Sequence, residues 1–227
     1  MRLTFELAQA THTEIIEADL KHCIVAGWAG RDLAAIEHHI EELAELGVPR
    51  PSSVPLYYRI AANQMVQDAD IQVVGSGSSG ETEVFVFNHQ GRLLVSLASD
   101  HTDRVLEAHS VALSKQICAK PVAREAWLFS DVAEYWDELI IRAYIQEDGK
   151  EVLYQDGPLS TLKNPLELIE GYFQSTTMPE GFGMTCGTVG AIGGIRPAAQ
   201  FTMELYDPRR ERSIRHTYVA EVLPEVA

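Results

Sequence analysis

Residues 80–100 read GETEVFVFNHQGRLLVSLASD, and this stretch decides most of what can be said about the fold. Apolar strand residues flank Gln90-Gly91, a pair typical of a tight turn, so the segment predicts a β-hairpin. Pairing about that turn sets Glu81 opposite Asp100 and leaves Glu83 two residues further along the same strand. Directly opposed residues, and residues two apart, share a face of the sheet. Three acidic side chains are therefore expected to converge at the open end of the hairpin.

Such a cluster needs compensation, because unpaired carboxylates held this close destabilise a fold unless something positive lies among them. Oxygen ligands without Cys or His suit Mg²⁺ or Mn²⁺, or Ca²⁺ in a crystal. Three protein oxygens leave about three octahedral positions for water or a chelating substrate. Glu81, Glu83 and Asp100 thus predict a divalent metal site; the alternative is a solvated, acidic strand end.

The rest of the chain reads as short strands with few helices. Helical spacing of apolar residues predicts a helix over 32–46, ended by Gly47, and further helices over 103–119 and 165–174. Asn164 is a candidate N-cap for the last of these. Strands are expected at 2–7, 23–26, 56–60, 71–74, 83–87, 93–97, 139–145, 151–154, 183–186, 200–206 and 216–222. This order predicts a β-rich α+β fold rather than alternating βαβ units.

Composition narrows the class of protein. The 227 residues carry a formal charge of −15, which disfavours nucleic acid and anionic membrane as partners. The same field repels an anionic substrate, so a site for an acid needs a cation or a local Arg/Lys cluster. We see no signal peptide and no apolar run long enough to span a membrane. Three widely separated cysteines are expected to be buried, reduced thiols of a cytoplasmic protein.

Several further motifs follow one another in a recognisable order. Glu81-Thr-Glu83-Val-Phe-Val is followed by Ser99-Asp100-His-Thr-Asp-Arg104, by Lys115 ahead of Lys120-Pro121, and by Gly187-Thr188 in a Gly-rich segment. Upstream lie the helix segment 37–42 and the segment 55–59. In this order the chain resembles the fumarylacetoacetate hydrolase superfamily, over residues 25–222. It departs from the family pattern at Ser99, at Val189 and at Arg59, which stands one place off the usual Lys.

The resemblance implies a fold and a set of functional residues. The fold would be the superfamily's mixed β-roll over residues 71–227, preceded by a small N-terminal α/β cap over 1–70, together one compact unit. The cap would carry the 32–46 helix as a mobile lid. The implied residues are the metal ligands Glu81, Glu83 and Asp100, the catalytic groups His39, Glu42 and Lys115, and the substrate-binding residues Arg59, Gly187 and Thr188, with Mg²⁺ or Mn²⁺ as cofactor.

Two assignments have rivals with the same chemistry. His38 with Glu41 has the spacing of His39 with Glu42. His39 borders the apolar stripe of the helix whereas His38 points to the opposite, wet face, so we assign the base to His39. Lys120 competes with Lys115 as the residue that would anchor a substrate carboxylate or stabilise an enolate.

The resemblance also implies an activity. The substrate would be a small 2-oxo acid or dicarboxylic acid, chelated by the metal, which acts as a Lewis acid. Attack by a His/Glu-activated water would hydrolyse a C–C bond of a β-diketo acid; the alternatives on the same metal site are decarboxylation, hydration or isomerisation. A non-catalytic small-molecule-binding protein on the same fold is the alternative class. We expect a homodimer.

Overall fold

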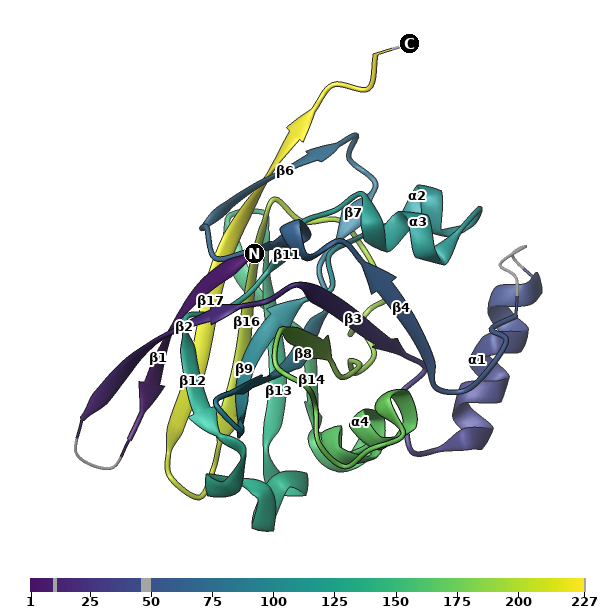
Figure 1. The fold of residues 1–227 in the computed structure, drawn as a ribbon. Helices are drawn as coiled ribbons and strands as arrows, with labels where there is room; N and C mark the ends of the chain where they lie inside the picture. Colours follow the sequence, from purple (N-terminus) through teal and green to yellow (C-terminus); the bar gives the residue numbers. More distant parts are fainter. Residues whose placement is uncertain (10–11, 46–49, 227) are drawn as a thin grey trace.

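The structure is a computed structural model that describes residues 1–9, 12–45 and 50–226, with the side chains of His39, Glu42, Leu43 and Glu45 outside the description. Its main element is a mixed, curled sheet with the strand order β2-β1-β12-β9-β8-β15-β3-β4 (Figure 1). These strands are β1 (Arg2–Ala8), β2 (Thr13–Asp19), β3 (His22–Gly27), β4 (Leu56–Ile60), β8 (Thr82–His89), β9 (Arg92–Ser99), β12 (Glu125–Leu128) and β15 (Phe182–Thr185).

A second sheet packs against the first. Its order is β14-β13-β16-β17-β6, formed by β6 (Asp70–Val74), β13 (Ile140–Glu147), β14 (Lys150–Pro158), β16 (Gln200–Asp207) and β17 (Arg212–Leu223). Two short pairs complete the strands: β5 (Met65–Val66) with β11 (Lys120–Pro121), and β7 (Ser78–Ser79) with β10 (Thr102–Asp103). The helices are α1 (Leu33–Glu45), α2 (Arg104–Glu107), α3 (Val111–Gln116) and α4 (Pro165–Phe173), with 3₁₀ turns at Ala62–Gln64, Phe129–Asp131, Ala133–Glu138 and Leu159–Thr161. The strand-rich α+β class predicted from the sequence is confirmed.

The core explains why strand β8 is apolar on both sides. Val84 and Val86 belong to a cluster that the two sheets share, which also contains residues of β13 and β16. Phe85 and Phe87 point the other way, into a second cluster enclosed by the curl of the first sheet. A strand buried on both faces reads as a continuous apolar run. The hairpin that carries the acidic residues is therefore held rigidly from two sides.

The predicted register of this hairpin is confirmed. Thr82 pairs with Ser99 and Glu83 with Ala98, and the Asp100 amide donates to the Glu81 carbonyl over 2.9 Å. The turn residues Gln90 and Gly91 have φ of 54° and 75°, the left-handed values of a two-residue hairpin turn. Local sequence is sufficient to set such a register, because a slip by one residue would turn every apolar side chain to the wrong face.

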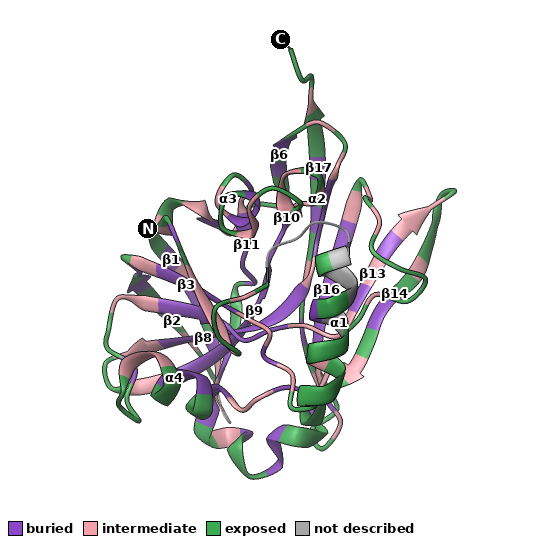
Figure 2. Cartoon of the chain, turned by 90° about the vertical axis from the view of Figure 1, so that its right-hand side faces the viewer, coloured by how far each residue is buried: buried purple, intermediate pink, exposed green. Residues whose placement is uncertain are grey.

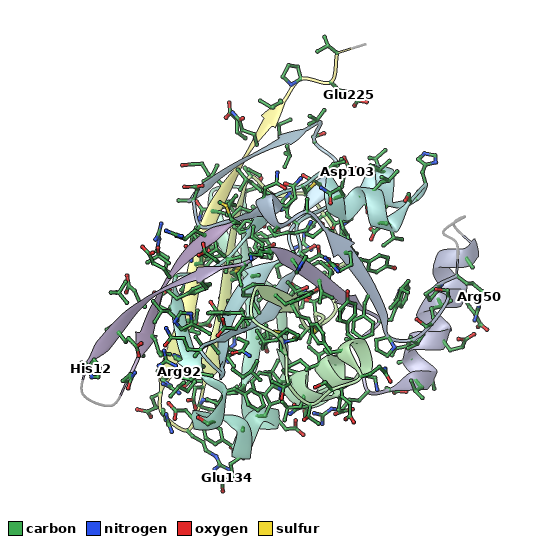
Figure 3. The ribbon with its side chains drawn as sticks, viewed as in Figure 1. His12, Arg50, Arg92, Asp103, Glu134 and Glu225 are labelled. Carbon is green, nitrogen blue, oxygen red and sulfur yellow. The ribbon has the colours of Figure 1, made fainter. Side chains whose placement is uncertain are left out.

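The helix predicted over 103–119 is wrong: two short helices, α2 and α3, occupy this segment. The carboxylate of Asp103, labelled in Figure 3, accepts the amide proton of Leu106 and begins α2. Ser110 has extended backbone angles, and its hydroxyl oxygen accepts the amide proton of Leu113 to begin α3. Short polar side chains favour caps over helix interiors, and Ser110 interrupts the predicted helix for this reason.

Two strands that the sequence did not indicate, β2 and β12, also belong to the first sheet. Strand β2 contains Ile15 and Ile16 side by side, of which the first is 62% exposed and the second 4%. An apolar residue on the wet face hides the alternation by which a strand is recognised. Strand β12 is four residues long and is defined by its pairing with the distant strands β1 and β9.

Helix α1 begins where the sequence places it. The Asp32 carboxylate accepts the amide protons of Ala34 and Ala35 at 3.0 and 3.1 Å. Ile40 is buried and Ile36 partly so, whereas Leu33 is exposed, and much of the helix faces solvent (Figure 2). Helix α4 has the predicted Asn164 N-cap, here as part of a capping box.

The proposed division into a cap (1–70) and a metal-binding domain (71–227) stays a prediction. Strands β1 to β4 lie in the same sheet as β8 and β9, so the sheet includes strands from both sides of the proposed boundary at residue 70.

The part of the chain described here contains no helix long and apolar enough to cross a membrane.

Candidate metal centre

The three acidic residues of the hairpin meet as the register predicts. Glu81 stands just before β8, Glu83 within it and Asp100 just after β9, and one carboxylate oxygen from each lies within 4.8 Å of the others. Asp100 is fully buried, Glu83 is 3% exposed and the side chain of Glu81 is 18% exposed. This burial contradicts the alternative of a solvated strand end.

Three cations from the next segment of the chain surround the carboxylates. The Lys115 ammonium, on α3, lies 2.5 Å from Asp100 Oδ2, and the Lys120 ammonium, on β11, lies 3.2 Å from Asp100 Oδ1. Arg104, on α2, lies 3.0 Å from Glu81. Both rival lysines of the sequence analysis therefore contact the same carboxylate. This is the local Arg/Lys cluster that an acidic protein needs where it binds an acid.

The two buried carboxylates have opposite electrostatic environments. Burial alone would raise the pKa of Asp100, but the nearby Lys115 and Lys120 outweigh burial and lower the pKa to about 2. Burial, and then repulsion by Asp100 and Glu81, raises the pKa of Glu83 to about 8. The Glu83 carboxylate accepts the amide proton of Gly187 at 2.8 Å. A cation beside Glu83 would counter the repulsion that contributes to this raised pKa.

The donor set fits a hard divalent cation. Asp100 Oδ1 is buried without a hydrogen-bond partner among the described residues, although Lys120 lies at ion-pair distance. Burial, and after it repulsion by Asp100 and Glu81, raises the pKa of Glu83, and a bound cation would offset that repulsion. All three donors are carboxylate oxygens, the ligands that Mg²⁺ and Mn²⁺ prefer. The residues thus match the predicted cofactor.

The raised pKa of Glu83 has a measurable consequence for the metal-free protein. The pKa of Glu83 is about 8 in the folded protein against an ordinary 4.5, so the folded state binds its proton more tightly than the unfolded state does. The contribution of Glu83 to the free energy of unfolding is therefore largest at low pH and is lost as the pH rises to about 8. His101 acts oppositely: burial lowers its pKa from 6.5 to about 3, so its contribution grows as pH rises to 6.5. The two effects oppose each other below 6.5, and a net loss remains between 6.5 and about 8.

We therefore expect the free energy of unfolding in chelator to fall by about 1 kcal/mol per pH unit in this window. Urea unfolding of the wild type and of Glu83→Gln, followed in parallel, measures it. The variant should show a flatter profile; an equally steep fall in both proteins would assign the effect to other groups. Asp100 titrates below the window, since its pKa is about 2.

Comparison with protein families identifies the chain. The model of a family described as proteins of unknown function, DUF2848, matches residues 26–218. The chain belongs to the DUF2848 family. No curated protein matches it.

Solved structures share the fold of this DUF2848 protein at low sequence identity. A 2-keto-3-deoxyarabinonate dehydratase aligns with a TM-score of 0.68 and 16% identity, over 96% of this chain and 79% of that one. The 2-keto-3-deoxy-D-arabinonate dehydratase complexed with magnesium and 2,5-dioxopentanoate gives 0.64 and 14%, with the same coverage. Cg1458 with an inhibitor gives 0.63 and 16%, over 94% and 81%.

The substrate-binding residues predicted in the DUF2848 protein lie in different places. Gly187 contacts the cluster through its amide; its φ is +85°, and a Cβ there would lie 2.8 Å from the Cβ of Ala29. The Thr188 hydroxyl donates to the Thr82 carbonyl at 2.6 Å and accepts from Gln155 at 2.8 Å. Thr188 thus ties the Gly-rich segment to β8.

Arg59 is not brought to the cluster. Its guanidinium donates to the Tyr172 hydroxyl at 3.0 Å and lies 2.8 Å from His22 Nδ1. Neighbouring residues of a strand point to opposite faces, and it is Tyr58 whose ring lies 5.7 Å from the Lys115 ammonium. The alternation of side chains along β4 places Tyr58 and Arg59 on opposite faces, so the prediction of Arg59 chose the wrong one of two adjacent residues.

The predicted dyad of the DUF2848 protein stays a prediction. His39 and Glu42 belong to α1, but their side chains lie outside the described residues. His38 and Glu41 are exposed, as their helical phase predicts.

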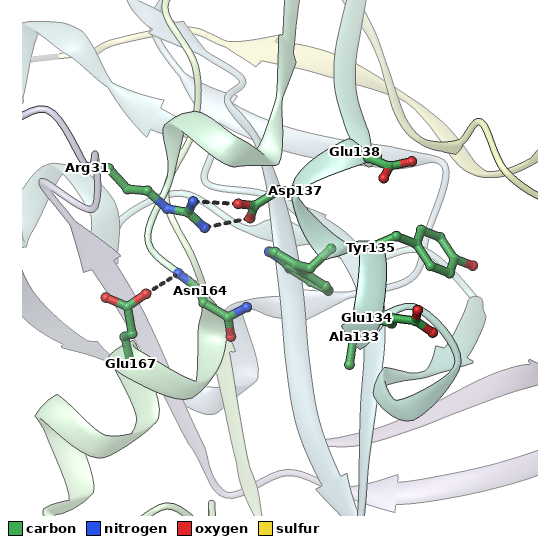
Figure 4. Close-up of a pocket in the computed structure, with 9 residues that line it drawn as sticks. Arg31, Ala133, Glu134, Tyr135, Asp137, Glu138, Asn164 and Glu167 are labelled. Carbon is green, nitrogen blue, oxygen red and sulfur yellow. Dashed lines mark hydrogen bonds and ion pairs between the residues drawn. The ribbon is translucent and has the colours of Figure 1, made fainter.

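A concavity elsewhere on the DUF2848 protein has no comparable chemistry. It measures about 510 Å³ and lies between the start of α4 and the 3₁₀ turn Ala133–Glu138 (Figure 4). Arg31 and Asp137 form a two-point ion pair in it, at 2.7 and 2.6 Å. The Asn164 backbone N–H, near Arg31, donates to the Glu167 carboxylate (Figure 4). Its most prominent polar groups are therefore engaged with one another, and the acidic cluster remains the candidate site.

All three cysteines, Cys23, Cys118 and Cys186, are buried and free, as predicted. Burial raises the pKa of each thiol, which disfavours the reactive thiolate.

Proposed function

We propose that this protein is a divalent-metal-dependent enzyme that acts on a small 2-oxo acid. The observation that carries the proposal is the buried trio Glu81, Glu83 and Asp100 with the Lys115 ammonium directly beside it. A fold shared with a dehydratase complexed with magnesium and 2,5-dioxopentanoate supports it. We further propose that the DUF2848 family is a branch of the fumarylacetoacetate hydrolase superfamily, with its β-roll, N-terminal cap and lid helix, because the motif order and the shared fold agree.

Each residue of the site has a distinct role in this proposal. Glu81, Glu83 and Asp100 would hold Mg²⁺ or Mn²⁺, which when bound polarises the 2-oxo carbonyl of the substrate. Lys115 keeps its proton, because its proximity to Asp100 outweighs burial and raises its pKa. Its ammonium is therefore available to a substrate carboxylate or to negative charge that develops on the substrate. The Tyr58 ring beside it would form one wall of the substrate site.

Two outcomes of this chemistry are to be distinguished. Hydrolysis of a C–C bond in a β-diketo acid requires an activated water, for which His39 with Glu42 is the candidate base. Dehydration, decarboxylation or isomerisation does not require water attack. His101, the imidazole next to Asp100, is not a second candidate base, because both its ring nitrogens are hydrogen-bonded and burial lowers its pKa to about 3. It is therefore too weak a base to activate water near pH 7.

Turnover of a substrate panel tests the proposal. We expect acylpyruvates, oxaloacetate or 2-keto-3-deoxy sugar acids to be consumed in the presence of Mg²⁺ or Mn²⁺, and no turnover after chelation. Products identify the reaction: a pair of carboxylic acids indicates C–C hydrolysis, and a dehydrated 2-oxo acid indicates a lyase. Tight binding of a 2-oxo acid without turnover of any compound would contradict the enzyme proposal and favour a small-molecule-binding protein. The expectation of a cytoplasmic homodimer also stays a prediction.

A further inference from the structure

A buried tyrosine from the second sheet contacts both chain neighbours of Asp100. Tyr218 lies on β17 and is 1% exposed. Its hydroxyl lies 2.8 Å from Ser99 Oγ and 2.8 Å from His101 Nδ1, so one oxygen joins the residues on either side of the candidate ligand. These partners are 119 and 117 residues away in sequence, and the contact exists only in the folded chain.

The same hydroxyl also lies against the residues that lead into β8, the first strand of the hairpin. Ser99 Oγ, one of its partners, accepts the Glu81 amide proton over 3.3 Å. A Cβ built on Gly80 would lie 2.5 Å from the Tyr218 hydroxyl oxygen and 2.8 Å from the Phe201 ring. Glycine at position 80 is therefore required for Tyr218 to approach. The residues that precede Glu81 and that flank Asp100 all meet at this one hydroxyl.

The hydrogen bonds of these buried side chains form a continuous chain that engages both ring nitrogens of His101. His101 Nε2 lies 2.9 Å from Ser78 Oγ, and the His101 carbonyl accepts from the Lys120 ammonium at 2.5 Å. A neutral imidazole has one donor and one acceptor nitrogen, and a hydroxyl can donate once and accept. Either direction of the chain Ser78–His101–Tyr218–Ser99 satisfies these rules. Without the Tyr218 hydroxyl, His101 Nδ1 would be buried and unpaired, and Ser99 Oγ would keep only the Glu81 amide at 3.3 Å. An unpaired buried nitrogen is costly enough to drive a rearrangement.

We propose that Tyr218 is a positioning residue that holds Asp100, and through Ser99 the backbone of Glu81, in the geometry that binds the metal. The inference rests on the proposed metal site. Tyr218 touches neither metal nor substrate and acts through Ser99 and His101. Groups that support ligating carboxylates in this way typically contribute about 10- to 100-fold to metal affinity.

The test compares Tyr218→Phe with Tyr135→Phe, which removes a second hydroxyl, buried and bonded to Asp207 Oδ2 at 3.1 Å on a different part of the fold. Titration of each purified protein with Mn²⁺, by calorimetry and by electron paramagnetic resonance, measures affinity and ligand geometry. We expect Tyr218→Phe to bind Mn²⁺ about 10- to 100-fold more weakly than the wild type and with an altered spectrum. Tyr135→Phe should retain wild-type affinity and spectrum.

A gentler variant, Ser99→Ala, guards against misfolding of Tyr218→Phe. It should also weaken Mn²⁺ binding, and the double variant should be no weaker than the worse single one, since both remove the same contact. Equal affinity in wild type, Tyr218→Phe and Ser99→Ala would overturn the proposal, as would an equal loss in Tyr135→Phe.

A readout without metal separates this inference from the proposed function. Amide hydrogen exchange of the metal-free protein should rise at residues 99–102 in Tyr218→Phe and not in Tyr135→Phe. If the wild type binds no Mn²⁺, the metal-site proposal fails, whereas the exchange result still decides whether Tyr218 orders this segment. Unchanged exchange at residues 99–102 would show that Tyr218 does not hold it.

Discussion

Replacing Glu83 with Gln is expected to abolish the binding of Mg²⁺ and Mn²⁺ and, with it, turnover of any 2-oxo acid, while leaving the fold intact. The amide keeps the size of the side chain and an oxygen that can accept from the Gly187 amide. It removes the negative charge that a hard cation requires of a ligand flanked by Asp100 and Glu81. Because the metal-free carboxylate is repelled by its neighbours, the variant should be at least as stable as the wild type in chelator at pH 8.

Calorimetry with Mn²⁺ and thermal unfolding with and without the ion measure these effects. Glu204→Gln is the matched control, because Glu204 is another carboxylate only 9% exposed, on β16, where Arg142, Tyr144 and Ser213 contact it. It should lose stability through its broken ion pair but keep metal affinity and turnover. Wild-type Mn²⁺ affinity in Glu83→Gln would remove Glu83 from the metal site and leave the buried cluster as an ion-pair network.

Replacing His39 with Ala is expected to reduce turnover by about 10²–10⁴, the usual contribution of a positioned general base. The argument rests on helical phase. Ile36 and Ile40 point inward on α1, and Ile40 is 3% exposed. Position 39 borders this inward face, where an imidazole can be half buried beside Glu42, which would fix its tautomer. Metal affinity should not change, because the metal ligands lie on a different element.

His38→Ala is the natural control, since His38 is exposed on the same helix. It should alter turnover little. Equal losses in the two variants, or a larger loss in His38→Ala, would contradict the phase argument. If neither variant matters while Glu83→Gln removes activity, no water-activating base is needed, and the lyase interpretation replaces hydrolysis.

The features predicted correctly are those whose physical cause is local. The hairpin register follows from a turn at Gln90-Gly91 and from apolar residues that must stay buried, and both can be read within residues 80–100. The Asn164 cap and the start of α4 have the same character. At Ser110 two local signals compete: helical spacing of apolar residues predicts one long helix, whereas a short polar side chain favours a helix cap. In the structure Ser110 caps α3.

The charges around the cluster could be predicted only in kind. An acidic chain with a site for an acid needs nearby cations, but nothing in the sequence distinguishes Lys115 from Lys120. The break between α2 and α3 and the short pairing of β11 with β5 bring both ammonium groups to Asp100. The choice between Arg59 and Tyr58 likewise depends on which face of β4 meets α3.

By itself the sequence determined that Glu81, Glu83 and Asp100 share one face of one hairpin, because strand alternation and turn geometry act over a few residues. Only the tertiary structure decided that these carboxylates are buried, that Arg104 and two lysines lie beside them, and that the Tyr218 hydroxyl contacts both Ser99 and His101. The burial of the carboxylates and their pKa values depend on contacts between residues more than a hundred positions apart in sequence, as well as on near neighbours. The packing of the two sheets brings these distant residues together.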